Sequence, residues 1–203
     1  MKNFILISLF TMYPVGVANA DIVWNSGSRT MYDNKAYAWN LKYTLAPQEI
    51  ITGAVLEFAS LKDREWDNLD KFYTHLLNEH RSTTDGWVQA GSDLDPHWWG
   101  VTAKHVDDFF APDPTNNPII GTHTPPGTSS VDLSYDLMAL DLGDELASFM
   151  ANGEFAIGID PDCPWTVSNM KFTLTTTVVP VPGAVLLGVL GLGAAGMKLR
   201  KRA

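Results

Sequence analysis

The last part of the chain carries the feature that most restricts what it can become. Val178 to Met197 is a run of 20 residues without a charged side chain. As a helix rising about 1.5 Å per residue, such a run would span about 30 Å, the thickness of a bilayer hydrocarbon core. Four cations follow at once, and positive charge beside a span stays on the cytoplasmic side. The pattern predicts a transmembrane helix with the C-terminus inside the cell; the cations are Lys198, Arg200, Lys201 and Arg202.

The composition of this run bears on how long it would stay in a membrane. Pro180 and Pro182 stand where a helix would begin, a place at which a missing N–H costs least. Glycine weakens a helix by up to about 1 kcal/mol relative to alanine, and the run holds five of them. A helix of low stability favours a segment that halts in the membrane only temporarily during export. An ordinary single-pass membrane anchor is the alternative. The glycines are Gly183, Gly188, Gly191, Gly193 and Gly196.

The tail has three parts in a fixed order. Val179-Pro180-Val181-Pro182 comes first, a glycine-rich apolar span follows from Gly183, and the basic cluster ends it. This order resembles the PEP-CTERM sorting signal of bacteria that make exopolysaccharide, in its Val-Pro-x-Pro-Gly-Ala variant. Where that family usually has glutamate between the prolines, this chain has Val181. The resemblance implies that an exosortase-type membrane protease recognises and cuts the tail.

The other end of the chain is typical of a secretory signal peptide. Lys2 precedes an apolar run from Phe4 to Met12, and the small residues of Ala18-Asn19-Ala20 follow. We expect the secretion translocon to export the chain and a signal peptidase to cut after Ala20, which makes Asp21 the new N-terminus. The predicted organisation is a signal peptide (1–20), one exported domain (21–177) and a sorting tail (178–203).

The predicted exported domain is strongly acidic. The chain has 23 acidic and 14 basic residues and a net charge of −9. All the acidic residues lie in 21–177, whereas Lys2 and the four tail cations lie outside it, so the domain carries −14. Binding nucleic acid needs clustered cations, so the sequence argues against that partner. The acidity favours solubility and divalent cations, and a merely solvated surface is the alternative.

Alternating apolar residues dominate this domain and predict strands. In Tyr37 to Tyr43 one face is aromatic and expected to be buried, and in Ile51 to Ser60 the side chains of Leu56 and Phe58 are expected to face inward. Glu154 to Asp160 and Asn169 to Thr177 are expected to form a final pair. The remaining predicted strands are Lys71 to Leu77, Trp87 to Ala90, Trp99 to His105 and Val131 to Leu137.

One helix and one long loop complete the expected architecture. The helix is predicted to bury Leu142, Leu146, Phe149 and Met150, to be capped by Asp141 or Asp144, and to stop at Gly153. Ala111 to Ser130 holds five prolines and is predicted to be a surface loop. Many short strands with turns between them favour a mainly β fold, a two-sheet antiparallel β-sandwich of jelly-roll-like order. The pattern is similar to small exported bacterial sandwich domains that precede this sorting tail.

Two acidic groups suggest a calcium site. Asp63, Asp67 and Asp70, with Glu65, follow the strand that ends near Ser60, and Asp160 and Asp162 flank Pro161. Ca²⁺ takes six to eight oxygen ligands, which loops between strands can supply. The spacing does not follow that of an EF-hand loop, and a solvated acidic loop is the alternative.

A tryptophan-rich stretch suggests a second site. Trp98 and Trp99 stand close to Asp93 and Asp95, with Trp87 and His97 nearby. Exposed indole rings stack on sugars and carboxylates bind sugar hydroxyls, so the stretch predicts a carbohydrate-binding patch, with core or loop anchors as the alternative.

Catalysis and zinc find little support in the sequence. It contains neither a Gly-x-Ser-x-Gly motif nor a glycine-rich phosphate loop. The spacings of His75 to His80 and of His97 to His105 match no zinc pattern. Cys163, the single cysteine, is predicted to be a buried small hydrophobe without a disulfide partner in the chain.

Taken together, these features predict a non-enzymatic exported protein of the cell surface or of the exopolysaccharide matrix of a biofilm. It is expected to be sorted through its tail and processed by an exosortase. The alternative prediction is a secreted carbohydrate-binding module assisted by Ca²⁺. A secreted hydrolase would need two carboxylates facing each other across a cleft.

Overall fold

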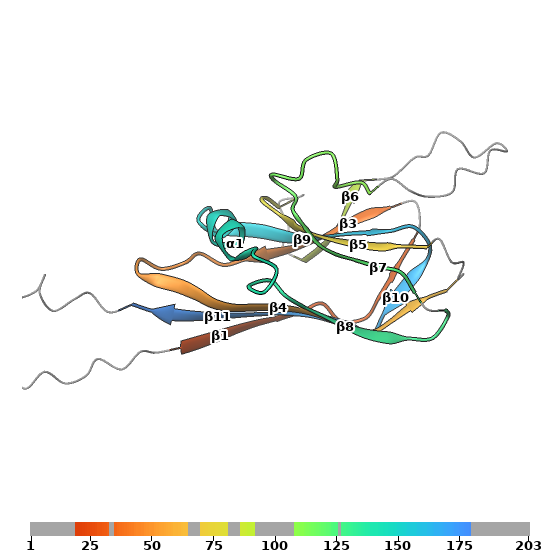
Figure 1. The fold of residues 1–203 in the computed structure, drawn as a ribbon, viewed down its shortest axis with the longest axis horizontal. Coiled ribbons are helices and arrows are strands. Elements are labelled where there is room, and N and C mark those ends of the chain that lie inside the picture. Colours follow the sequence, from red (N-terminus) through yellow and green to blue (C-terminus); the bar gives the residue numbers. More distant parts are fainter. Residues whose placement is uncertain are drawn as a thin grey trace, which may run out of the picture.

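The computed structural model describes residues 19–32, 35–64, 70–80, 86–91, 108–125 and 127–179. Within these ranges the chain forms two antiparallel β-sheets packed face to face, with one short helix (Figure 1). This confirms the predicted two-sheet β-sandwich; the jelly-roll-like order stays a prediction. No helix in the described ranges is long and apolar enough to cross a membrane. Most of the signal peptide, expected to be helical, most of the predicted transmembrane helix and the Trp99 to His105 strand lie outside these ranges. The described ends of the first two are strand, since Asn19 and Ala20 lie in β1 and Val178 in β11.

The first sheet is built around one long strand. β4 (Glu49–Asp63) pairs with β8 (Val131–Asp136), with β11 (Asn169–Val178), and near its end with β10 (Trp165–Val167). β1 (Asn19–Asn25) adds to β11, and β2 (Arg29–Met31) adds to β10. The sequence analysis missed the three strands β1, β2 and β10, of which β2 and β10 have only three residues each.

The second sheet has the order β6–β3–β9–β5–β7. Its strands are β6 (Gly86–Gly91), β3 (Ala36–Lys42), β9 (Glu154–Pro161), β5 (Phe72–Leu77) and β7 (Ile119–His123). The strands predicted near β3, β5 and β6 are therefore confirmed. The expected pairing of the last two long strands is wrong, because β9 lies in this sheet and β11 in the other. The apolar periodicity of β9 and of β11 indicates a strand with a buried face. It does not indicate which strand lies beside it in the sheet.

The core lies between the two sheets, where alternate residues of each strand meet. Leu56, Phe58 and Phe172 come from the first sheet, and Trp39 and Ile157 from the second, all less than one-tenth exposed. The inward orientation predicted for Leu56 and Phe58 is confirmed.

The second sheet is covered on both faces, which the sequence analysis did not foresee. β3 was expected to bury one face only, yet the intervening Ala38 and Asn40 are buried as well. Phe110 packs with Ala38 and Ala156 in a second apolar cluster, with Phe109 against it. A strand covered on both faces needs no polar alternation, so its second face can be buried with small residues.

The predicted surface loop from Ala111 to Ser130 is wrong in part, because it contains β7. Residues Phe72 to His75 of β5 pair with β7, and the strand is bounded by Pro118 and Pro125. Proline is tolerated where a strand begins or ends, so a proline-rich stretch can still hold a short strand.

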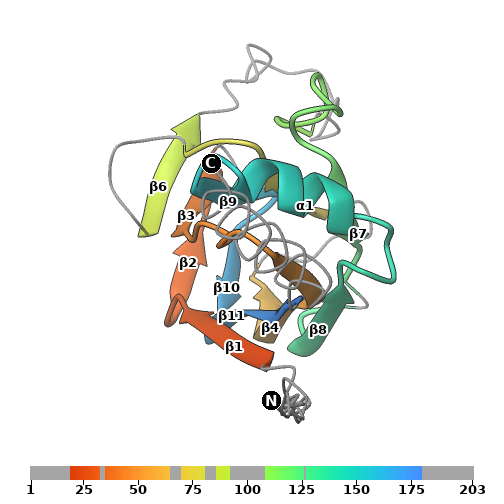
Figure 2. The same ribbon diagram turned by 90° about the vertical axis from the view of Figure 1, so that its left-hand side faces the viewer.

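The helix α1 (Gly143–Met150) buries Leu146, Phe149 and Met150 in the inter-sheet core, as predicted. Neither Asp141 nor Asp144 caps it: the N-cap residue is Leu142, without a side-chain cap bond, and Asp141 has a φ of 61°. Gly153 has a φ of 83° and donates its N–H to Met150, consistent with the predicted stop. Figure 2 shows α1 lying across one end of the sandwich.

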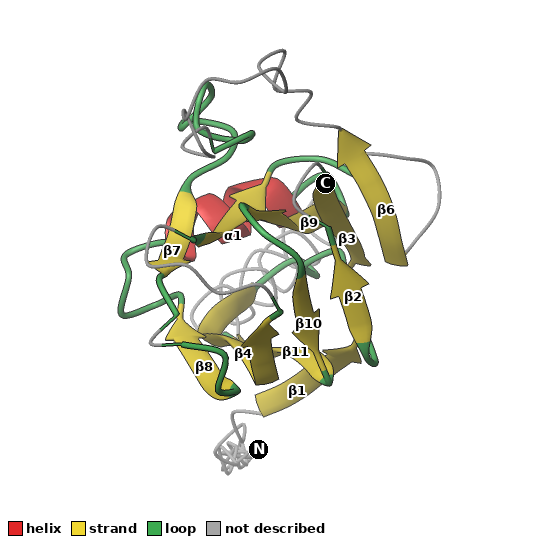
Figure 3. Cartoon of the chain, turned by 90° about the vertical axis from the view of Figure 1, so that its right-hand side faces the viewer, coloured by secondary structure: helices red, strands yellow, loops and turns green. Residues whose placement is uncertain are grey.

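The described termini lie together at that same end. Asn19 and Ala20 of β1 stand opposite Thr177 and Thr176 of β11, and the Val179 N–H donates to the carbonyl of Gln48 at 2.8 Å. Figure 1 shows the start of β1 and the arrowhead of β11 at its left-hand end. We call this the terminal end of the sandwich, and the opposite end, which faces the viewer in Figure 3, the distal end.

Candidate cation site

Five buried residues with ionisable side chains meet near the distal end. Asp63 is the last residue of β4, and Asp70 stands two residues before β5. Asp160 lies in β9, and Asp162 and Cys163 follow it in the connection to β10. Each of the five side chains is at most 7% exposed. Such burial of four carboxyl groups is unusual, because aspartate is rarely buried without a partner.

Backbone hydrogen bonds hold the three segments in register. The Asp162 N–H donates to the carbonyl of Lys71 at 3.0 Å, and the Arg64 N–H donates to that of Pro164 at 2.9 Å. Trp165 of β10 stands opposite Asp63. The site therefore brings together the end of β4 in one sheet and the ends of β5 and β9 in the other.

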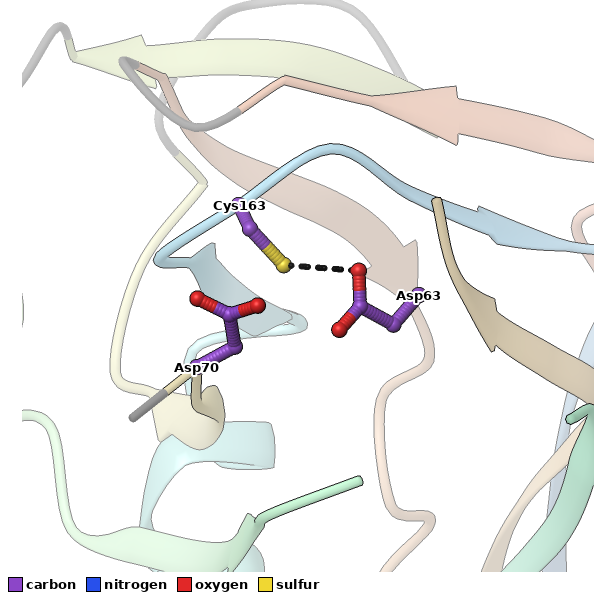
Figure 4. A group of neighbouring side chains, drawn as sticks. All are labelled: Asp63, Asp70 and Cys163. Carbon is purple, nitrogen blue, oxygen red and sulfur yellow. Dashed lines mark hydrogen bonds between the residues drawn. The ribbon is translucent and has the colours of Figure 1, made fainter. Parts of the chain in front are cut away.

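Asp63, Asp70 and Cys163 form the tightest group. One ligand atom from each, a carboxylate oxygen or the sulfur, lies within 4.8 Å of the other two. The Cys163 Sγ donates a hydrogen bond to Asp63 Oδ1 at 3.2 Å. Figure 4 shows the Asp63 and Asp70 side chains on either side of the sulfur. Two ionised carboxylates at such a separation repel each other by about 3 kcal/mol at an effective dielectric constant of about 20.

The thiol in this group keeps its proton. Burial, the hydrogen bond to Asp63 and the neighbouring charges of Asp63 and Asp70 all raise the pKa of Cys163 above its ordinary value. The prediction that Cys163 is buried is confirmed, since the residue is 5% exposed. The sequence analysis missed its contact with Asp63, which lies 100 residues earlier in the chain.

Asp160 and Asp162 differ in how their carboxylates are used. Asp160 Oδ2 accepts the N–H of Phe109 at 2.8 Å and so helps to hold the cover of the second sheet. Asp162 Oδ2 is buried and has no hydrogen-bond partner among the described residues. Burial raises the pKa of Asp162 to about 8, together with the charges of Asp160, Asp70 and Asp108, and Lys71 offsets this only in part.

Of the predicted calcium residues, the structure groups Asp63 and Asp70 with Cys163. The Asp162 carboxylate does not belong to this group, and Asp160 accepts the N–H of Phe109. Asp67 and Glu65 lie outside the described residues. The alternative of a solvated acidic loop does not fit the four aspartates described, because all of them are buried.

The residues of the predicted carbohydrate patch cannot be placed in the same way. Trp98, Trp99, Asp93, Asp95 and His97 lie outside the described residues, so that patch stays a prediction. Trp87 is described, and its ring stacks on Trp39 with centroids 6.2 Å apart. The guanidinium of Arg29 lies 4.9 Å from the centroid of the Trp87 ring. The Trp87 side chain therefore packs against its neighbours and acts as an anchor.

His75 and His80 make separate hydrogen bonds, whereas Nε2 of His123 is buried without a partner among the described residues. His75 bonds through Nδ1 to the carbonyl of Asn117 and through Nε2 to Asp108 Oδ2, both at 2.8 Å. His80 Nε2 bonds to the carbonyl of Leu41 at 2.7 Å. His105 lies outside the described residues.

A polar pocket near the terminal end was not foreseen. It has a volume of about 370 Å³ and is lined only by asparagine, aspartate and glutamate side chains. Asn116 Nδ2 donates to Asp113 Oδ2 at 2.9 Å, and Lys42 lies 3.5 Å from Glu154, so its lining groups already interact with neighbours. Ligand pockets usually have a largely apolar lining, which this one lacks.

Of the sorting and cleavage residues, the structure describes Val179, Ala20 and Asp21 only. Ala20 and Asp21 lie in β1, and Val179 follows β11 directly. Ala18 and the tail from Pro180 to Arg202 lie outside the described residues.

No protein-family model matches the chain, and no curated protein matches it. Among solved structures, the fold is similar to the capsid protein in a crystal structure of decameric BFDV capsid protein, with a TM-score of 0.32 and 13% sequence identity. The match covers 81% of this chain and 100% of the capsid chain.

Proposed function

We propose that this chain is a non-enzymatic exported protein, sorted through its C-terminal tail to the cell surface or the exopolysaccharide matrix. Its sandwich would serve there as a structural or adhesive module. The two ends of the sequence support this role, since one is typical of a signal peptide and the other resembles a sorting signal. An exosortase-type protease, the membrane and exopolysaccharide are the partners that the proposal implies.

One structural observation carries the proposal furthest. Asn19 and Thr177 stand opposite each other at the end of the β1–β11 pair. The chain therefore enters β1 and leaves β11 at the same end of the sandwich. Attachment through either predicted membrane segment would leave the rest of the domain projecting away from the membrane.

The distal end is far from this point of attachment. The 15 residues of β4 run from Glu49, opposite Val178, to Asp63 in the candidate site. At about 3.3 Å per residue, an extended strand of this length spans up to about 45 Å. A domain held at its terminal end would thus present its distal loops to the surroundings, as suits an adhesive or matrix-building module.

Truncation tests the proposal in the native host. A chain ending at Val179 keeps every described residue and loses the tail from Pro180 onward, so we expect it to fold, to be exported and to be released into the medium. The full-length chain should be retained at the surface or in the matrix. A matched control, Asp144→Asn in the full-length chain, should be retained as well. Equal retention of the truncated and full-length chains would contradict the proposal.

A further inference from the structure

The polar pocket beside α1 is built from four separate segments of the chain. Its walls come from the residues that follow β5, the loop before β7, the turn after α1 and the start of β9. Its volume of about 370 Å³ lies in the range of about 300 to 1,000 Å³ that small-molecule sites have. The Asn78 N–H donates to the carbonyl of Asn116 at 3.0 Å, and the Leu76 N–H donates to that of Pro118 at 2.9 Å. Backbone pairing therefore fixes two of these walls against each other.

The side chains that line the pocket are four amides and three carboxylates. Asn78 Nδ2 donates to Asn116 Oδ1 at 3.1 Å, and Asn116 Nδ2 donates to Asp113 Oδ2 at 2.9 Å. An asparagine side chain can donate two hydrogen bonds and accept two, so this chain orients both amides and uses only part of their capacity. The amides belong to Asn78, Asn116, Asn117 and Asn152, and the carboxylates to Glu79, Asp113 and Glu154.

The negative charge of the pocket is partly compensated by neighbouring groups. Asp113 also accepts the backbone N–H of Asn116 at 3.2 Å. Glu154 Oε1 lies 3.5 Å from the ammonium of Lys42, and Glu154 Oε2 lies 3.8 Å from Nδ1 of His80. Since most of the lining side chains are neutral amides, the pocket does not have the dense oxygen shell that a Ca²⁺ ion takes. The three carboxylates disfavour an anion, because like charges repel.

A neutral ligand rich in hydroxyl groups fits both kinds of side chain. A hydroxyl donates to a carboxylate or an amide oxygen and accepts from an amide N–H. A sugar ring carries several hydroxyls side by side, so it can engage amides and carboxylates at the same time. An apolar ligand would instead cover these groups without offering them hydrogen bonds, which is costly.

A second hollow adjoins the first and adds the apolar surface that the first one lacks. The two hollows share Asn78 and Asn116 as lining residues, and the second has a volume of about 470 Å³. Its walls include the rings of Pro114, Pro118 and Phe149, which can pack on the C–H face of a sugar. Two adjoining hollows suit a chain of linked sugars better than a single ring.

We propose that the two hollows form one groove, the α1 groove, that binds a neutral polysaccharide, with Asn78, Asn116 and Asn152 bonding to its hydroxyls. This deepens the proposed function, because it names the class of ligand that a matrix module would hold. Binding by the purified chain does not depend on how the tail is processed. A failure of the groove therefore leaves the sorting proposal intact, and a failure of sorting leaves the groove intact.

Affinity electrophoresis tests the α1 groove. The full-length chain is purified in a detergent without a sugar headgroup and run on native gels that contain hydroxyethyl cellulose, dextran, galactomannan or alginate. The chain has a net charge of −9 and moves toward the anode, so binding to a polymer in the gel retards it relative to a marker protein. We expect retardation by at least one of the three neutral polymers and none by the anionic alginate.

Variants place the binding in the groove. Asn116→Ala and Asn152→Ala should each weaken binding by about fivefold, the effect of losing a hydrogen bond between neutral groups. Asn152→Ala removes no side-chain hydrogen bond of the described structure, so its Tm should equal that of the wild type. Asn25→Ala is the matched control, because it removes an exposed amide from β1 outside the groove, and it should bind as the wild type does.

Three outcomes would overturn the proposal. The first is a wild-type chain that none of the neutral polymers retards, whether or not alginate does. The second is retardation that stays unchanged in both Asn116→Ala and Asn152→Ala. The third is retardation that disappears in EDTA and returns with CaCl₂, since a bound ion and not the amides would then recognise the sugar.

Discussion

Gly121 marks a point at which the two sheets approach too closely for a larger residue. It lies in β7 of the second sheet, and the ring that faces it is that of Tyr135 in β8 of the first. A Cβ added to Gly121 would lie 2.4 Å from Cε1 and 2.8 Å from Cζ of Tyr135. Carbon atoms pack comfortably at about 3.5 to 4.0 Å, so in Gly121→Ala the ring must move.

The cost of that movement can be worked out from the contacts of the ring. The Tyr135 ring packs edge-to-face on Phe58, with centroids 6.2 Å apart and an interplanar angle of 87°. Overpacking costs about 1 to 3 kcal/mol, and disturbing an aromatic pair adds about 0.5 to 1.5 kcal/mol. We expect Gly121→Ala to lower the free energy of unfolding by about 2 kcal/mol. Gly53→Ala is a milder control, since its Cβ would lie 3.3 Å from Thr175 Cβ.

Urea unfolding of a double-mutant cycle measures the contact directly. Tyr135→Leu removes the ring atoms that the new Cβ would strike. In that background Gly121→Ala should cost less than half of its cost in the wild type, a coupling of about 1 kcal/mol or more. If the two substitutions are additive, Tyr135 does not lie against Gly121 and the packing of β7 on β8 is wrong.

Three further predictions follow from the described contacts. Phe172 is fully buried and packs on Trp24 and Phe155 at 5.7 and 5.8 Å, so Phe172→Ala should cost about 3 to 5 kcal/mol in urea unfolding; a cost below about 1 kcal/mol would contradict the core. Burial alone would raise the pKa of Glu49, but hydrogen bonds from Thr176, Tyr43 and the Ala46 N–H outweigh it and lower the pKa. The stability that Glu49 contributes is therefore present above its ordinary pKa of 4.5 and lost as the pH falls through the lower folded pKa, so the stability difference between wild type and Glu49→Gln should shrink in acid; a difference that stays constant in acid would contradict this. Cys163 is 5% exposed and its pKa is raised, so iodoacetamide should label it in urea but not in the native chain; rapid native labelling would place the thiol at the surface.

Much of the fold could be predicted because β4, β8 and β11 each face the core on one side. Their alternation of apolar and polar residues is strict enough to read directly, as in Val131 to Asp136. β7 could not be predicted, because its five residues lie between prolines and such a stretch is typical of a loop. The strand is recognised only from its pairing with β5. The partners of β9 and β11 were misassigned for a related reason: periodicity describes a strand's faces and not its edges.

The sequence indicated some residues of the candidate site but not that they would be buried together. Asp63 and Asp70 attract notice as carboxylates that flank strands. Their burial and their meeting with Cys163 depend on the β4–β10 and β5–β9 pairings, which join segments about 100 residues apart. For the same reason Cys163, although predicted to be buried, could not be linked to Asp63 from the sequence. The Asp-Pro-Asp-Cys run at the end of β9 was the available signal.

The central claim is that both ends of the chain direct an exported sandwich to the cell surface. The most direct test is the intact mass of the protein recovered from the surface and the medium of its native host. We expect a species that begins at Asp21 and ends near Pro180 to Gly183, with or without an added group. A species that still ends at Ala203 would contradict processing of the tail and make it a permanent anchor.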